Sequence, residues 1–106
     1  MIHVLVVASK EDLAEPEAGR SAIEVLHAHG ADEAVEKLGR NRRIDAVLLL
    51  AGAENEAIAA AIREDSLAPP PFYLPASASD LVGARRLSSD LPRELLDLVA
   101  RALASA

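Results

Sequence analysis

Two histidines and an acid lie close together in the sequence and are the first candidates for chemistry. His27 and His29 are two residues apart, so they would share one face of an extended strand, and Asp32 follows them. Imidazole and carboxylate groups bind transition metals. Only two strong ligands are evident, however, and this spacing is more typical of surface histidines at a strand end. His3, inside an apolar run, is predicted to be a satisfied core or boundary histidine.

A second group of polar residues follows the first apolar run. Glu11 and Asp12 offer carboxylates for a displaced metal site, but acids in the first turn of a helix are also favoured by the helix dipole. Ser9 and Lys10 suggest phosphate binding, yet no glycine-rich loop accompanies them, and the phosphate-binding fingerprints need one. Four serines are expected near the functional end of the sheet, but no general base other than His27 and His29 accompanies them. These serines are Ser77, Ser79, Ser88 and Ser89. We therefore expect no enzyme activity, no resident cofactor and no metal.

Composition narrows the class of protein. The 106 residues fit a single domain spanning 1–106, and 51% hydrophobic residues favour a packed core. A formal net charge of −6 argues against nucleic acid, because phosphate contacts need a cationic face. The cluster at residues 40–43, with three arginines, is either a small polyanion patch or a solvated helix end.

The absence of cysteine and of a long apolar segment adds two further limits. No disulfide, thiolate metal site or cysteine nucleophile is available, which fits a reducing compartment. No segment approaches the ~20 apolar residues of a membrane span. We therefore expect a soluble cytoplasmic protein without membrane association.

Two apolar runs must position any functional site. Residues 2–7 and 46–50 are each about one strand long, are rich in β-branched residues or leucine, and are apolar on both faces. This pattern is typical of central strands in a parallel sheet covered by helices. In such sheets the chemistry lies at the carboxyl ends of the strands. Here those ends carry Ala8, Ser9 and Leu50, which are poor at acid–base work and metal binding, so the pattern indicates a scaffold without an active site.

The remaining pattern predicts a regular alternation of strands and helices. Pro16 should end the first helix within about two turns, and the fourth helix is reduced to a turn or a stub. Alternation of this kind predicts an α/β, flavodoxin-like three-layer sandwich. Its five-stranded parallel sheet has the order 2-1-3-4-5, with the first and fourth helices shortened. The further strands are expected at 22–27, 72–74 and 84–88, and the helices at 9–15, 31–40, 54–65, 76–83 and 91–103.

Several of these segments together resemble the receiver domain of bacterial response regulators, the phosphorylated module of two-component signalling. The resemblance covers nearly the whole chain and lies in residues 2–7, 25–35, 44–49, 71–74 and 83–96. It implies the same sheet order and a role in signalling.

The resemblance also implies where phosphotransfer residues would stand, and this chain departs from the family at each position. Ala8 and Ser9 replace the two acids that hold Mg²⁺, and Leu50 replaces the phospho-accepting Asp. Pro75 replaces a Thr or Ser, and the lysine position falls near Ser89, between Ser88 and Asp90. Mg²⁺ needs oxygen ligands, and a leucine side chain cannot accept a phosphoryl group. The resemblance therefore implies a degenerate receiver, a pseudo-receiver, with no Mg²⁺-dependent phosphorylation.

We accordingly expect a phosphorylation-independent, receiver-like regulatory module that acts through protein–protein interaction, with a protein partner or as a homodimer. Shortened helices would leave apolar flanks thinly covered, and exposed apolar patches often mark partner sites. Receivers commonly use the last helix and the fifth strand for such contacts. The candidate interaction surface is therefore Arg85, Arg86, Leu87, Leu91, Arg93, Leu95 and Arg101.

The alternative is a small-ligand or nucleotide sensor on the same fold. Its cleft would lie between the dipeptides at 8–9, 51–52 and 75–76, where small side chains leave room. A cavity larger than ~300 Å³ with convergent polar groups would favour a ligand site, and a flat, filled surface would favour the contact module.

Overall fold

A computed structural model describes residues 2–8, 23–40, 43–66 and 68–104 of the chain. Within them, five strands, three helices and one short 3₁₀ turn follow one another in the order predicted from the sequence. None of the described helices is long and apolar enough to cross a membrane. The elements are β1 (Ile2–Ala8), β2 (Ile23–Ala28), α1 (Ala31–Arg40), β3 (Ala46–Leu50), η1 (Gly52–Glu54), α2 (Asn55–Asp65), β4 (Phe72–Leu74), β5 (Ala84–Arg86) and α3 (Pro92–Ala104).

The five strands form one parallel sheet in the order β2-β1-β3-β4-β5. This is the flavodoxin-like arrangement predicted from the sequence, with the two weakest strand patterns at the edges. The register pairs Val4 with Ala46 and Ala8 with Leu50, so β1 and β3 end side by side. All five carboxyl ends therefore meet at one edge of the sheet.

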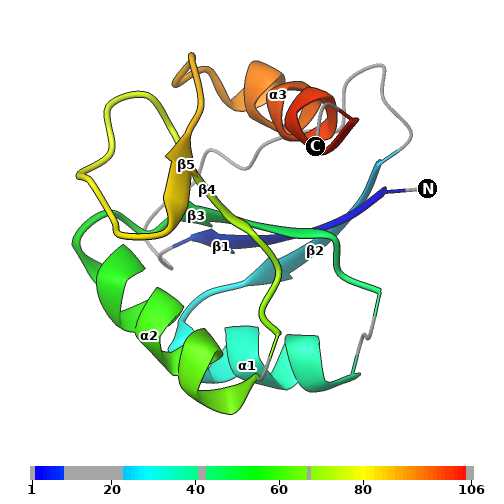
Figure 1. Ribbon diagram of the computed structural model, residues 1–106, viewed down its shortest axis with the longest axis vertical. Coiled ribbons are helices and arrows are strands. Elements are labelled where there is room, and N and C mark those ends of the chain that lie inside the picture. The colour runs from blue at the N-terminus through cyan, green and yellow to red at the C-terminus, as the bar shows by residue number, and fades with distance from the viewer. Residues whose placement is uncertain (1, 9–22, 41–42, 67, 105–106) are drawn as a thin grey trace.

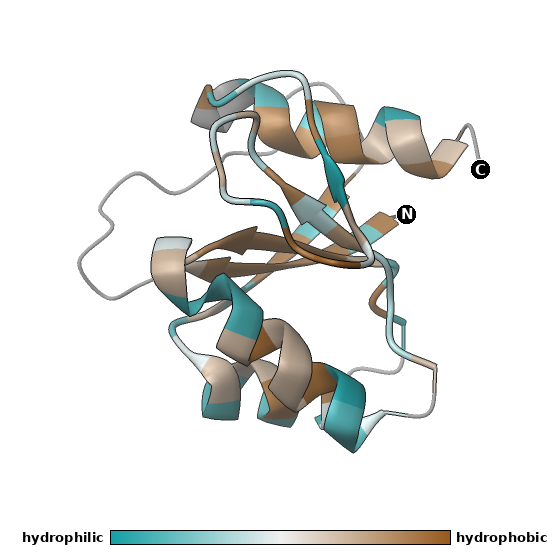
Figure 2. Cartoon of the chain, turned by 60° about the vertical axis from the view of Figure 1, so that its left-hand side comes forward, coloured by the Kyte–Doolittle hydropathy of each residue, from teal (hydrophilic) through white to brown (hydrophobic). Residues whose placement is uncertain are grey.

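Helices cover both faces of the sheet (Figure 1). The central strands supply apolar side chains to each face. Leu5 and Val7 of β1 pack toward α1 and α2, whereas Val4 and Val6 pack toward α3. Successive side chains of a strand point to opposite faces, so an unbroken apolar run is what a sheet buried on both sides requires. Figure 2 shows the hydrophobic central strands lying between the helical layers.

Of the two helices expected to be shortened, one is reduced to turns and the other lies outside the described residues. The segment at 76–83 was expected to be a turn or a stub of helix, and residues 75–83, all of them described, form turns. A helix of two turns at most is marginal on its own, and serine and aspartate side chains compete for its backbone groups. The expected helix at 9–15 belongs to a segment that the structure does not describe.

Candidate functional site

The carboxyl edge of the central strands is built from apolar residues. Ala8 is 5% exposed at the end of β1, directly beside the half-buried Leu50 at the end of β3. Pro75 follows β4 immediately and is also half-buried. Three of the positions singled out from the sequence thus lie at the ends of neighbouring strands, while Ser9 is outside the described residues.

A cleft of about 520 Å³ opens to solvent at this edge, beside β3 and β4. Its volume exceeds the ~300 Å³ expected of a small-ligand site. Gly52 and Pro75, two residues of the cleft predicted from the sequence, line it, whereas Ala8 is not among its described lining residues. The described lining consists of Leu49, Leu50, Gly52, Ala53, Asn55, Pro75, Ser77, Ala78, Ser79, Asp90 and Leu95.

Asn55 shapes the cleft from the start of α2. It is 7% exposed, its Oδ1 accepts a hydrogen bond from the Ala51 backbone N–H at 2.8 Å, and its Nδ2 donates to the Leu49 carbonyl at 3.5 Å. These bonds satisfy backbone groups where the chain leaves β3, and Gly52 then turns it with a φ of +61°, a left-handed conformation that suits glycine. The amide of Asn55 is therefore committed to holding the loop rather than to a ligand.

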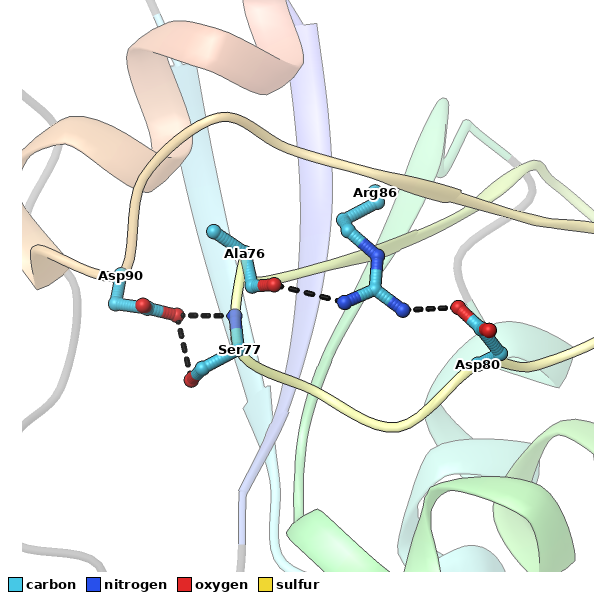
Figure 3. Close-up of polar contacts among 5 residues, drawn as sticks. All are labelled: Ala76, Ser77, Asp80, Arg86 and Asp90. Atoms are coloured by element: carbon cyan, nitrogen blue, oxygen red, sulfur yellow. Dashed lines mark hydrogen bonds and ion pairs between the residues drawn. The ribbon is translucent and has the colours of Figure 1, made fainter.

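A second polar contact joins two further lining residues of the cleft, Ser77 and Asp90 (Figure 3). Both the backbone N–H and the hydroxyl of Ser77 donate to Oδ1 of Asp90, each at 2.8 Å. The Ala76 N–H also donates to the Ser89 carbonyl at 3.2 Å. These bonds join the β4–β5 connection to the segment that leads into α3.

The first turn of α3 begins at Leu91, whose carbonyl accepts the N–H groups of Glu94 and Leu95. The Asp90 side chain turns to Ser77. Ser89 donates its hydroxyl to Glu94 at 2.6 Å and accepts the Leu91 N–H.

Two arginines hold the β4–β5 connection, the segment expected to be a turn or a stub of helix. The Arg63 guanidinium lies 5.0 Å from the centre of the Phe72 ring and donates to the Val82 carbonyl at 2.5 Å. Arg86 donates to the Ala76 carbonyl at 2.8 Å and pairs with Asp80 (Figure 3). Stacking and hydrogen bonds from charged donors thus fix this segment, with only Ala78 and Leu81 adding apolar contact to the core beneath.

Gly83 is expected to be intolerant of a side chain for two separable reasons. Its φ is +83°, and an added Cβ would lie 2.6 Å from the Arg63 Nη2. We expect Gly83→Ala to lower the free energy of unfolding by about 1–2 kcal/mol, measured by urea denaturation. In an Arg63→Ala background the clash disappears, so the added cost of Gly83→Ala should be smaller. Equal costs in both backgrounds would show that the end of the Arg63 side chain moves aside at little cost, and that the positive φ alone accounts for the effect.

The candidate interaction surface loses two of its members. Leu87 and Leu95 are 7% and 2% exposed and pack in the core beneath α3, so neither offers area to a partner. Leu91 is 47% exposed and Val82, which the sequence analysis did not include, is 88% exposed. Arg85, Arg86 and Arg101 are exposed, and the side chain of Arg93 is outside the described part of the structure.

The histidines lie apart from the cleft. His3 is half-buried at the start of β1, with Nε2 3.0 Å from a Glu24 carboxylate oxygen, as expected for a satisfied boundary histidine. Its backbone N–H donates to Asp45 at 2.9 Å, and the Asp45 N–H returns a bond to the His3 carbonyl at 2.8 Å. Among the residues that the structure describes, no group of three histidine or acidic side chains is placed to hold a metal ion. Glu11 and Asp12 lie outside those residues.

The chemical capacity of the site follows from these contacts. Asn55, Ser77 and Asp90 already hydrogen-bond protein groups. The one hydroxyl–carboxylate pair among the described lining residues is Ser77 with Asp90, and no histidine lies among them. The cleft offers apolar walls and one carboxylate, which suits binding.

No protein-family model, curated protein or solved structure matches the chain.

Proposed function

We propose that this chain is a phosphorylation-independent regulatory module that acts through protein–protein interaction. The observation that carries the proposal is the apolar edge of the sheet, where Ala8 and Leu50 lie side by side and Pro75 follows the next strand. In the receiver resemblance the position of Ala8 holds Mg²⁺, that of Leu50 accepts the phosphoryl group, and that of Pro75 carries a Thr or Ser. A methyl group cannot hold Mg²⁺, and a leucyl side chain cannot accept the phosphoryl group.

The contact surface that we propose consists of the exposed members of the predicted set together with Val82. Val82 and Leu91 supply apolar area, and Arg85, Arg86 and Arg101 supply exposed charge. Apolar groups at the centre of an interface give affinity, whereas charged groups mainly contribute specificity and association rate. Such a surface suits a partner that carries acidic residues around an apolar patch, or a second copy of the chain with that pattern.

Site-specific photo-crosslinking tests both parts of the proposal. A photoreactive residue replaces Arg85, Leu91 or, as a control on α2, the exposed Glu64. We expect discrete adducts from positions 85 and 91, in purified protein or in extract of the source cell, and none from position 64. Mg²⁺ with acetyl phosphate should leave the yields unchanged. Adducts from 64 alone would refute the surface, and a yield that depends on acetyl phosphate would refute phosphorylation independence.

A second candidate function, small-ligand sensing, is favoured by the cleft itself. Its volume of about 520 Å³ lies within the usual range of ligand sites, and its apolar walls suit a small molecule. The polar groups are fewer than the sequence analysis required, because Asn55 and Ser77 are already hydrogen-bonded to neighbouring residues. Ligand binding therefore depends on shape and on the charge of the lining.

A further inference from the structure

We propose that the cleft beside β3 and β4 binds an amphipathic cation, an apolar chain that ends in an ammonium or guanidinium group. The inference rests on the second candidate function, small-ligand binding, and names the class of ligand. It concerns the cleft alone and does not require the partner surface on β5 and α3.

The apolar part of the ligand is inferred from the walls of the cleft. Leu50 comes from β3 and Leu95 from α3, and Pro75 and Ala78 belong to the β4–β5 connection. Burial of methylene groups against such walls is favourable by about 0.8 kcal/mol for each group fully removed from water. A chain of several methylenes therefore suits the cleft better than a compact polar molecule.

The cationic end is inferred from the only charge in the described lining. Asp90 contributes a carboxylate, and no described lysine or arginine lines the cleft. A carboxylate has about four acceptor sites, so the two hydrogen bonds from Ser77 leave room for a further donor. Figure 3 shows the Asp90 carboxylate directly beside Ser77 of the β4–β5 connection, so a cation bound there would also lie next to that connection.

The surroundings strengthen the preference for a cation. Glu54 is exposed in η1 beside two lining residues, and Glu94 binds Ser89, the neighbour of Asp90. Arg86, which contacts the same connection, is paired with Asp80. The full chain carries a formal charge of −6, which attracts cations and repels anions. Phosphates and nucleotides therefore fit this cleft poorly.

Three probes with one apolar body and different end groups test the charge. Hexylammonium, hexanol and hexanoate are titrated into ¹⁵N-labelled protein at low salt, and amide shifts of Gly52, Ala78 and Ser79 report on the cleft. We expect hexylammonium to bind about two- to fivefold more tightly than hexanol, the range for an exposed ion pair, and hexanoate most weakly. Added salt of about 0.5 M should reduce the difference.

Two variants separate the charge of Asp90 from its hydrogen bonds. Asp90→Asn removes the charge and keeps an oxygen that can accept the Ser77 N–H, so the preference for hexylammonium over hexanol should disappear. Ser77→Ala removes the hydroxyl bond and keeps the charge, so the preference should remain. An unchanged preference in Asp90→Asn would overturn the proposal.

The remaining outcomes show whether the proposal of a cation fails alone or together with the proposal of a ligand site. Equal binding of hexanol and hexylammonium in the cleft would refute the cation and leave small-ligand binding standing. Failure of all three probes to shift cleft amides in a saturable way would refute both. If hexylammonium is the preferred probe, N-acetyl-lysine N-methylamide identifies the source of the cation. Affinity equal to that of hexylammonium indicates a lysine side chain, and several-fold weaker affinity indicates a free amine.

Discussion

Replacing Leu96 by alanine is expected to lower the free energy of unfolding by about 3 kcal/mol, the largest effect that we predict. Leu96 is 0% exposed and lies in the cluster that α3 forms with Val4, Val6 and Leu48. Loss of the side chain removes buried apolar area and leaves a cavity that the surrounding strands cannot fill, because both faces of β1 and β3 are packed. Urea denaturation followed by circular dichroism measures the change.

Leu98→Ala is the matched control for this experiment. Leu98 is on the same helix but only half-buried at the margin of the cluster, so its loss should cost distinctly less. A similar cost for both variants would mean that α3 does not turn its Leu96 face toward the sheet. The exposed part of α3, including Leu91, would then need to be reassigned, and the proposed contact surface with it.

Asn55→Ala is expected to cost about 2 kcal/mol, an unusually large effect for a polar residue at the start of a helix. Alanine is the better helix former by a few tenths of a kcal/mol, but the buried Ala51 N–H loses its acceptor, and an unsatisfied buried group costs about 1–3 kcal/mol. Thermal or urea unfolding gives the stability. The amide resonances of Ala51 and Gly52 should also shift, because Asn55 fixes the turn that lines the cleft.

Glu56→Ala serves as the control, since Glu56 is exposed in the same turn of α2. We expect its effect to remain within about 0.5 kcal/mol, as for most surface substitutions. An Asn55→Ala variant as stable as Glu56→Ala would show that Ala51 does not depend on the asparagine. The shape of the cleft would then have to come from the main chain alone.

The sheet could be predicted because its signal is local and repeated. The runs around Val4–Val7 and Val47–Leu50 are apolar at every position, and only a strand covered on both faces needs that pattern. The weaker patterns of β2 and β5 likewise marked them as edges. Element boundaries differed by one or two residues, as where the helix expected from Glu54 begins with a 3₁₀ turn.

The site was less accessible to sequence reasoning because its contacts are distant along the chain. Ser77 and Asp90 are 13 residues apart on either side of β5, and Arg63 is 19 residues from its acceptor at Val82. No periodicity connects such pairs, and an aspartate just before a helix suggests a cap. Asn55 was overlooked for a related reason, since an asparagine near a helix start gives no sign that its partners are backbone groups of the preceding loop.

The two halves of the sheet differ in how firmly they are held. Strands β1 and β3 have seven and five residues and carry packed side chains on both faces, whereas β4 and β5 have three residues each. The segment between β4 and β5 depends on a few charged side chains for its position. Local opening should therefore begin at β5 and proceed inward, leaving the β2-β1-β3 half folded as a cooperative unit. The cleft lies along the boundary between the two halves. Its lining residues in β3 belong to the half that stays folded, and those in the β4–β5 connection belong to the half that opens first.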